Sequence, residues 1–153
     1  MMIKTIQDAS EKRLIARGVL EALPAWFGIK PAREAYINDS AGMPFFAAFD
    51  GEKPVGFITL KETGKDTAEI YVMGVLEEYH RRGVGKMLLI KAKDAATQKG
   101  YSFIQVKTVQ MGKYPEYDKT NRFYRAVGFK EFEVLPDLWD AQNPCQIYVM
   151  RVG

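Results

Sequence analysis

The stretch from Ala68 to Val109 constrains the fold of this chain more than any other part. It starts as a strand pattern up to Leu76, passes through the basic glycine turn His80–Lys86, and continues with apolar residues at helical spacing up to Gly100. A second strand pattern, Tyr101–Val109, follows. Because a strand–helix–strand step normally pairs its two strands in parallel, we expect one parallel pair inside the sheet.

The strands before this stretch should pair antiparallel. Strand patterns at Pro44–Phe49 and Val55–Leu60 are joined by a short turn that contains Gly51, which predicts a hairpin. A second polar turn leads from the hairpin into Ala68–Leu76, and a short strand pattern at Ile3–Ile6 opens the chain. The sequence therefore predicts a mixed, mostly antiparallel sheet flanked by helices, which is an α/β (α+β) fold.

Two helices are expected between the first strand and the hairpin. Asp8 has the spacing of a capping residue, and the apolar residues that follow predict a helix ending near Pro24. Pro31 opens a second helix. We place Trp26 and Phe27 in the loop between the two.

The last third of the chain predicts one helix and a final strand pair. The helix should start at Asp118 or Thr120 and end before Gly128. Strand patterns at Phe129–Val134 and Gln146–Val152 are separated by a loop, 135–144, that holds Trp139 and two prolines.

Size and composition exclude several classes of protein. A chain of 153 residues fits a single domain, 1–153, and a net charge of +3 is too weak to mark a nucleic-acid or membrane-surface protein. One cysteine, Cys145, and one histidine, His80, make a metal site unexpected. No signal peptide pattern and no apolar run of roughly 20 residues is present, so we expect a soluble, cytoplasmic protein with no nucleic-acid or membrane partner.

The basic glycine turn is the segment most suited to ligand binding. A Gly-x-Gly turn at a helix start leaves main-chain N–H groups free, and the helix dipole adds roughly half a positive charge there. Arg81, Arg82 and Lys86 add full charges, so a pyrophosphate would be well held. The alternative is a tight turn whose arginines are simply solvated.

The surrounding order of elements resembles the GNAT superfamily of acetyl-CoA-dependent N-acetyltransferases. Residues 70–89 are similar to that family's first motif, with the small-Val pair Gly74-Val75 ahead of a Gln/Arg-x-x-Gly-x-Gly/Ala turn. His80 stands where the motif has Gln or Arg. By resemblance, the turn residues would bind the pyrophosphate of acetyl-CoA through their main-chain N–H groups; the turn comprises Arg81, Arg82, Gly83, Val84, Gly85 and Lys86.

A second signature supports the same resemblance. Residues 121–129, Asn-Arg-Phe-Tyr-Arg-Ala-Val-Gly-Phe, are similar to the family's Asn-x-x-Phe-Tyr-x-x-x-Gly-Phe. The resemblance implies that the main chain of Met73, Gly74 and Val75 pairs with the pantetheine arm, that Asn121 touches the cofactor, and that Tyr124 faces the thioester sulfur. Acetyl-CoA is then a co-substrate, and no metal is required.

Acid–base chemistry can be assigned on this basis. A main-chain N–H near Val75 would stabilise the oxyanion, and Tyr124 would protonate the leaving thiolate as general acid; its alternative is a core aromatic. Glu69 matches the glutamate base of the histone-acetyltransferase branch, although an exposed sheet glutamate is the alternative. Strand alternation would put Glu69, Tyr71, Met73 and Val75 on one face.

The amine acceptor should bind among aromatic rings and carboxylates from loops and helices. The rings are Trp26, Phe27, Tyr36, Tyr114, Tyr117 and Trp139, and the carboxylates are Glu34, Asp118, Asp137 and Asp140.

The sequence thus predicts acetyl transfer to a primary amine of a small molecule or peptide. The alternatives are a non-catalytic acyl-CoA-binding sensor or interaction module and a basic nucleic-acid binder. The acceptor, the physiological acyl group and a homodimer stay open.

Overall fold

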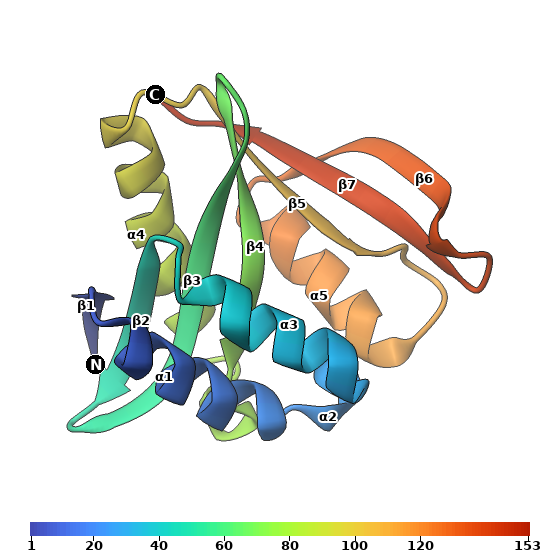
Figure 1. The fold of residues 1–153 in the computed structure, drawn as a ribbon. Helices are drawn as coiled ribbons and strands as arrows, with labels where there is room; N and C mark the ends of the chain where they lie inside the picture. The colour runs from blue at the N-terminus through green and yellow to red at the C-terminus, as the bar shows by residue number, and fades with distance from the viewer.

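A computed structural model describes all 153 residues around one seven-stranded sheet. The strand order is β1-β2-β3-β4-β5-β7-β6, and only β4 and β5 pair in parallel (Figure 1). The expected mixed, mostly antiparallel sheet is confirmed. The elements are β1 (Met2–Ile6), α1 (Ala9–Glu21), α2 (Pro24–Phe27), α3 (Lys30–Ser40), β2 (Phe45–Asp50), β3 (Lys53–Gly64), β4 (Thr67–Val75), a 3-10 turn (Glu77–Tyr79), α4 (Val84–Gln98), β5 (Phe103–Val109), α5 (Pro115–Ala126), β6 (Lys130–Asp140) and β7 (Asn143–Arg151).

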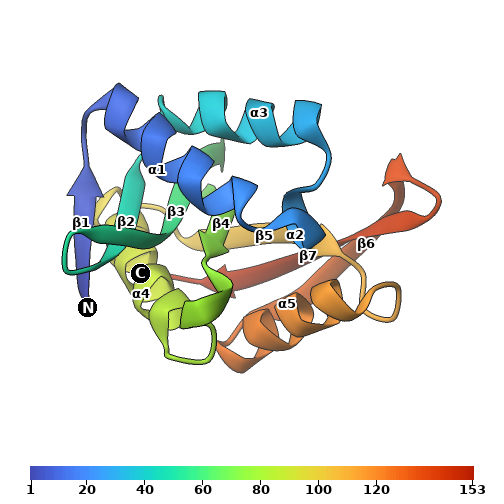
Figure 2. The ribbon, with the colours of Figure 1, turned by 90° about the horizontal axis from the view of Figure 1, so that it is seen from below.

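Helices cover both faces of the sheet. Figure 2 shows α1, α2 and α3 on one face and α4 and α5 on the other. The packing of α1 on β4 is so close that a Cβ on Gly74 would lie 3.1–3.4 Å from the side chains of Val19, Leu20 and Leu23. None of the helices combines the length and the apolar character that a membrane crossing needs.

The predicted loop at Trp26 and Phe27 is wrong, because these residues lie in the short helix α2. Pro24 occupies its first turn, where a missing N–H costs nothing, and the N–H groups of Trp26 and Phe27 both donate to the carbonyl of Leu23. The helix expected at Asp118 or Thr120 also starts earlier, at Pro115, for the same reason.

The predicted loop between the last two strands is mostly strand. β6 runs on to Asp140, whose carboxylate accepts from the Gln142 N–H and the Asn143 amide and closes a tight turn into β7. β6 is an edge strand with two interruptions. Phe132 has no partner between the paired residues Glu131 and Glu133, and residues 136–139 are skipped in the pairing with β7.

Candidate active site

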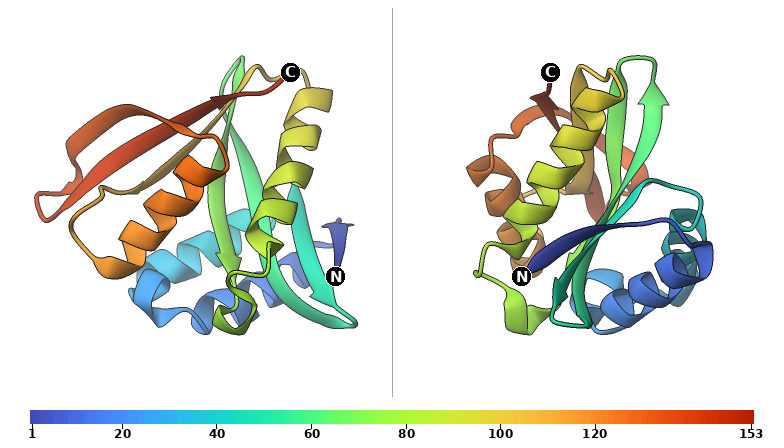
Figure 3. Two further views of the ribbon diagram at one scale, coloured as in Figure 1. Left: turned by 180° about the vertical axis from the view of Figure 1, so that it is seen from behind. Right: turned by 90° about the vertical axis from the view of Figure 1, so that its left-hand side faces the viewer.

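β4 and β5 pair only along their first halves. The parallel register runs from Thr67–Phe103 to Ile70–Val106 and stops there. Beyond this point β4 stays paired with β3, β5 stays paired with β7, and the two strands diverge (Figures 1 and 3). We call the unpaired stretches, Tyr71–Val75 and Lys107–Val109, the strand gap.

A β-bulge in β4 begins where the strand gap begins. Ile70 pairs with Leu60 and Met73 pairs with Ile58, so Tyr71 and Val72 together oppose the single residue Thr59. The buried Thr59 hydroxyl accepts from the Val72 N–H at 3.3 Å and donates to the Val72 carbonyl at 3.4 Å. This hydroxyl thus supplies the partners that the bulge removes from Val72.

The bulge overturns the expectation that Glu69, Tyr71, Met73 and Val75 share one face. The Tyr71 hydroxyl donates to Asp39 of α3 at 2.6 Å, so Tyr71 lies on the face that α3 covers. The Met73 methyl instead lies beside Gly85 at the start of α4, on the opposite face. Because Tyr71 and Val72 both oppose Thr59, side chains after the bulge lie on the opposite face from the one that simple alternation predicts. The local sequence contains no pattern that predicts the bulge.

Met73 and Val75 direct their main-chain groups into the strand gap. The Leu76 N–H donates to Val55 of β3 at 2.9 Å, so Leu76 and Gly74 direct their main-chain groups toward β3. Because this direction alternates along an antiparallel strand, those of Val75 and Met73 point away from β3. The gap-facing carbonyl of Val75 has a partner, the His80 Nε2 at 2.6 Å. The other gap-facing groups can pair with an extended ligand, in line with the predicted role of Met73, Gly74 and Val75, which stays a prediction.

The turn before α4 has an unusual backbone. Gly83 has φ of +77°, and Arg81 has φ of +64°, which a non-glycine residue rarely adopts. The first main-chain bond of α4 runs from the Met87 N–H to the Gly83 carbonyl, so the N–H groups of the three preceding residues have no partner in the chain. No sequence pattern predicted the positive φ of Arg81.

Charge at this turn favours an anion. Arg81, Arg82 and Lys86 are exposed, and the first turn of α4 contains no acidic residue. The guanidinium of Arg82 lies 5.1 Å from the Tyr79 ring centre. Free N–H groups, the helix dipole and these cations together fit the pyrophosphate predicted for Arg81–Lys86; the assignment of each residue stays a prediction.

Gly85 brings three elements of the predicted site into contact. A Cβ at this position would lie 3.1 Å from the Phe123 ring of α5 and 3.3 Å from the Met73 methyl of β4. The second glycine of the turn therefore has a packing role: it lets α5 approach the strand gap closely.

Tyr124 is buried on α5. Its ring contacts those of Phe123, Phe129 and Tyr148, with centroids 5.4–6.1 Å apart, and its hydroxyl forms no hydrogen bond within the chain. Burial raises the pKa of Tyr124 above the ordinary value for tyrosine. A hydroxyl that keeps its proton and has no internal partner is free to donate to a ligand.

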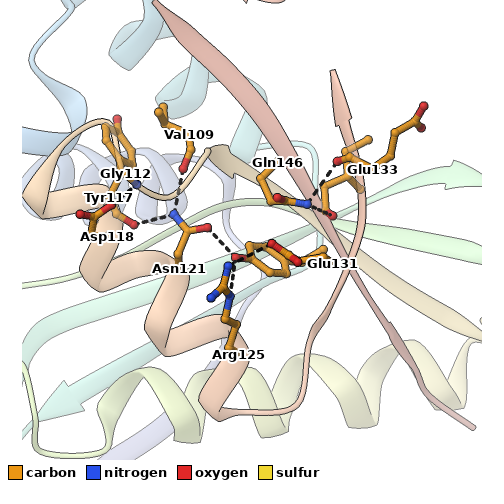
Figure 4. A network of polar contacts seen from close by, with 11 residues as sticks. Val109, Gly112, Tyr117, Asp118, Asn121, Arg125, Glu131, Glu133 and Gln146 are labelled. Atoms are coloured by element: carbon orange, nitrogen blue, oxygen red, sulfur yellow. Dashed lines mark hydrogen bonds and ion pairs between the residues drawn. The ribbon is translucent and has the colours of Figure 1, made fainter. Parts of the chain in front are cut away.

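Asn121 is fully buried, and its side chain forms hydrogen bonds with groups inside the protein (Figure 4). Its amide donates to the carbonyls of Val109 and Tyr117 at 2.8 and 2.7 Å, and its oxygen accepts from the Tyr148 hydroxyl at 2.6 Å. Asn121 therefore ties α5 to the end of β5 and to β7. Its predicted contact with a cofactor stays a prediction.

Glu69 lies in the paired half of β4, just before the strand gap. It is 9% exposed and forms an ion pair of 2.9 Å with Lys107, the first residue of β5 beyond the paired register. The pair links β4 to β5 at the point where they separate. Sequence reasoning singled out Glu69 but not Lys107, because the contact depends on the parallel register.

A cluster of aromatic rings lies on the α3 side of β4. The Tyr36 ring contacts those of Phe27 and Tyr71 edge to face, with centroids 5.8 and 5.3 Å apart. The Trp26 indole donates to α5, and Tyr117 of α5 donates to the Trp26 carbonyl. Burial raises the pKa of Tyr36 and of Tyr117.

The structure spreads the other predicted acceptor-side residues apart. Tyr114 contacts Tyr117, but Asp137 and Trp139 lie on β6. Glu34 pairs with Arg17 of α1 at 2.7 Å, Asp118 accepts the Gly112 N–H and Asp140 closes the β6–β7 turn. Asp39, which holds Tyr71, is the carboxylate that sequence reasoning missed.

Cys145 is a buried free thiol at the start of β7, and burial raises its pKa to about 11. A thiol with so high a pKa is a poor nucleophile. No group of three or more His, Cys, Asp or Glu side chains is placed to hold a metal ion.

Comparison with known proteins places most of the chain in one family. The model of the Acetyltransferase (GNAT) family matches residues 14–129. Two curated relatives are the uncharacterized N-acetyltransferases YsnE of Bacillus subtilis, 26% identical over 65% of this chain, and CT2212 of Chlorobaculum tepidum, 30% identical over 69%. The matches span 64% and 55% of the lengths of these relatives.

Solved structures agree in fold over the whole chain. A crystal structure of a GNAT-family protein from Desulfovibrio desulfuricans has a TM-score of 0.84 and 19% identity, and it covers 99% of both chains. An aminoglycoside 6'-N-acetyltransferase complexed with coenzyme A has a TM-score of 0.78 and 16% identity, covering 99% of this chain and 97% of that one. At these identities the likeness concerns the fold.

Proposed function

The chain belongs to the GNAT family of acetyltransferases, and on this premise we propose that it transfers an acetyl group from acetyl-CoA to a primary amine by direct attack. Residues 1–153 would act as a single N-acetyltransferase domain. The observation that carries the proposal is the strand gap, which leaves main-chain groups of Met73 and Val75 unpaired beside the cationic start of α4.

Binding of acetyl-CoA needs an anion site and a partner for two amides. The free N–H groups at the start of α4, with Arg81, Arg82 and Lys86, suit the pyrophosphate. The Met73 N–H and carbonyl and the Val75 N–H suit an extended amide chain. The solved aminoglycoside 6'-N-acetyltransferase that shares this fold is complexed with coenzyme A.

Two groups would then serve the transfer itself. The gap-facing Val75 N–H stabilises the negative charge that develops on the thioester oxygen when the amine attacks. Tyr124, whose hydroxyl keeps its proton because burial of the side chain raises its pKa, donates to the sulfur as the carbon–sulfur bond breaks, so that coenzyme A leaves as a thiol. The resulting tyrosinate recovers its proton from solvent.

The attacking amine must lose one proton before and one proton after the new carbon–nitrogen bond forms. An alkylamine of pKa about 10.4 is mostly charged at neutral pH. Glu69 is the carboxylate that we propose to accept the proton through water, since it lies at the start of the strand gap on the side of the tyrosine cluster. Its ion pair with Lys107 fixes its position.

The acceptor is proposed only as a class. Proteins of the same fold act on aminoglycosides and on the alanine of a ribosomal protein, as their names state. A primary amine presented by a small molecule or by a peptide N-terminus is therefore the first class to screen, with release of free thiol from acetyl-CoA as the readout.

Replacement of Tyr124 by Phe tests the proposal. We expect kcat to fall by about 10²–10⁴, because the acid is lost, while the Kd for acetyl-CoA changes less than about threefold. Thermal unfolding should report the cofactor in both proteins, with about 2.7 kcal/mol of stabilisation at 100 times Kd. Stabilisation without thiol release on any amine would favour the alternative, a non-catalytic acyl-CoA-binding module, and no stabilisation would exclude both.

A further inference from the structure

The one histidine of the chain lies between the cofactor turn and the helix layer on the other face. His80 Nε2 is 2.6 Å from the Val75 carbonyl, although the residue is exposed. Because a carbonyl only accepts, Nε2 carries the hydrogen in this contact. The same carbonyl faces the strand gap, since the Leu76 N–H of that peptide donates to β3. The His80 imidazole is thus hydrogen-bonded to the last main-chain carbonyl of β4 that faces the strand gap.

The imidazole also contacts Trp26. The two rings meet edge to face with centroids 5.8 Å apart and an angle of 74°. On its other side the Trp26 indole N–H lies 3.2 Å from both the Glu116 carbonyl and the Thr120 hydroxyl of α5. Trp26 therefore bridges the end of β4 and α5 at the strand gap.

The helix that carries Trp26 depends on these contacts. α2 has four residues, and none of them is buried. Besides the Trp26 contacts, Phe27 contacts Tyr36 and accepts from Arg33, and the Trp26 carbonyl accepts from Tyr117. Trp26 and Phe27 are half-buried against the core, but α2 has no fully buried residue, so the loss of one of these contacts lets this short helix shift.

We propose that His80 is a positioning residue that couples the cofactor site to the acceptor wall, by which we mean α2 with Trp26 and Phe27 and the adjoining rings of Tyr36 and Tyr71. This inference rests on the proposed function. A chain of amides that pairs with Met73 and the Val75 N–H reaches the Val75 carbonyl next, because both main-chain groups of Val75 face the strand gap, and there it competes with the imidazole. Acetyl-CoA displaces the imidazole, Trp26 loses its edge contact, and α2 shifts, so that the acceptor wall opens when the cofactor is in place.

Fluorescence of Trp26 tests the coupling. Trp26 and Trp139 are the two tryptophans, and Trp139 lies 46% exposed on β6, so Trp139→Phe makes Trp26 the sole reporter. In this protein we expect coenzyme A to shift the Trp26 emission to longer wavelength. With His80→Ala added, the emission should be shifted before coenzyme A is present and change little afterwards.

Calorimetry supplies the second readout. His80→Ala should bind coenzyme A about two- to tenfold more tightly, the factor that matches the net worth of one hydrogen bond. His80→Gln, whose amide can still donate to the Val75 carbonyl, should return to the parent affinity. Tyr79→Phe removes the 2.6 Å bond to Asp50 from the same turn without touching Trp26, and should behave like the parent in both readouts.

Two results would overturn the coupling and leave the proposed function intact: weaker binding of coenzyme A by His80→Ala, or an unchanged Trp26 emission while calorimetry detects bound coenzyme A. Absence of coenzyme A binding in the parent and in every variant would overturn the proposed function and the coupling with it.

Discussion

The two halves of β4 share one neighbour and differ in the other. Thr67–Ile70 is paired with β3 on one side and with β5 on the other, whereas Tyr71–Val75 is paired with β3 alone. The first half has a paired strand on each side. In the second half the gap-facing groups of Met73 and the Val75 N–H are available to a ligand, the Val75 carbonyl is bonded to His80, and a bulge marks the change. Pairing is thus given up in the half of β4 where we propose that acetyl-CoA binds.

The difference has a structural requirement. An unpaired buried N–H or carbonyl costs about 1–3 kcal/mol, so the bulge and the strand gap both need support from neighbouring groups. Thr59 replaces the bonds that the bulge removes from Val72 on the β3 side, and Gly85 lets α5 pack closely against the second half of β4.

Thr59→Val should destabilise the protein by about 2–4 kcal/mol, because the Val72 N–H and carbonyl both lose their partner in the core. Urea unfolding measures this loss. Thr108→Val is the matched control: Thr108 is also a buried strand threonine, 5% exposed, but its hydroxyl forms no hydrogen bond within the chain. Equal losses in the two variants would remove the special role of Thr59.

Gly85→Ala should cost about 1–3 kcal/mol, because the added methyl lies 3.1–3.3 Å from Phe123 and Met73 and forces α5 away. Binding of acetyl-CoA should weaken as well. Gly18→Ala on α1 is the control: no heavy atom lies within 4 Å of the new Cβ, so helix propensity alone should stabilise this variant by about 0.5–1 kcal/mol. Thermal unfolding shows whether the stability falls in Gly85→Ala and rises in Gly18→Ala. A Gly85→Ala protein more stable than the parent would contradict the packing argument.

Lys107→Met should cost about 1–2 kcal/mol, since it leaves the largely buried Glu69 carboxylate without its cation at the last tie between β4 and β5. Its effect on acetyl-CoA affinity should stay below about twofold, because the lost contact precedes the gap-facing groups. Glu131→Gln removes the charge of the exposed pair with Arg125, leaves the Arg125 bond to Tyr148 in place and serves as the comparison, with a much smaller loss. Chemical denaturation and calorimetry check both statements.

The smallest effect concerns alkaline pH. Burial raises the pKa of Tyr124, and burial with the Asp39 hydrogen bond raises that of Tyr71. Above about pH 10 the unfolded chain loses these protons before the folded one, so the unfolding free energy should fall as pH rises through that range. Tyr124→Phe should make this decline shallower. An identical pH dependence in the two proteins would show that Tyr124 does not titrate differently on folding.

Local features of the candidate site could be predicted from the sequence. Glycine spacing and charge marked the turn before α4, and helical spacing with Gly128 marked α5 as an element. The parallel pair followed from the rule that two strands joined through a helix normally run parallel. These signals lie within a few residues of the feature that they predict.

Features that depend on distant partners could not be predicted. In the sequence Thr59 is one polar residue in an apolar strand. Only the register of β3 with β4 places it opposite the bulge, where its hydroxyl bonds the main chain of Val72. Asn121 carries a recognisable signature, but its partner Tyr148 lies 27 residues away. His80 was visible as a departure from a motif, yet its contacts with Val75 and Trp26 required the folded turn.

The two interruptions in β6 bear on how the protein behaves when it is concentrated. An exposed edge strand invites neighbouring chains to extend the sheet, and β6 carries the exposed apolar residues Phe132, Leu138 and Trp139. The unpaired Phe132 and the skipped residues 136–139, with Pro136 among them, leave no long regular run of main-chain groups for another strand to follow. Four carboxylates along the strand repel a second copy. The edge can therefore stay apolar without becoming a seed for fibrils.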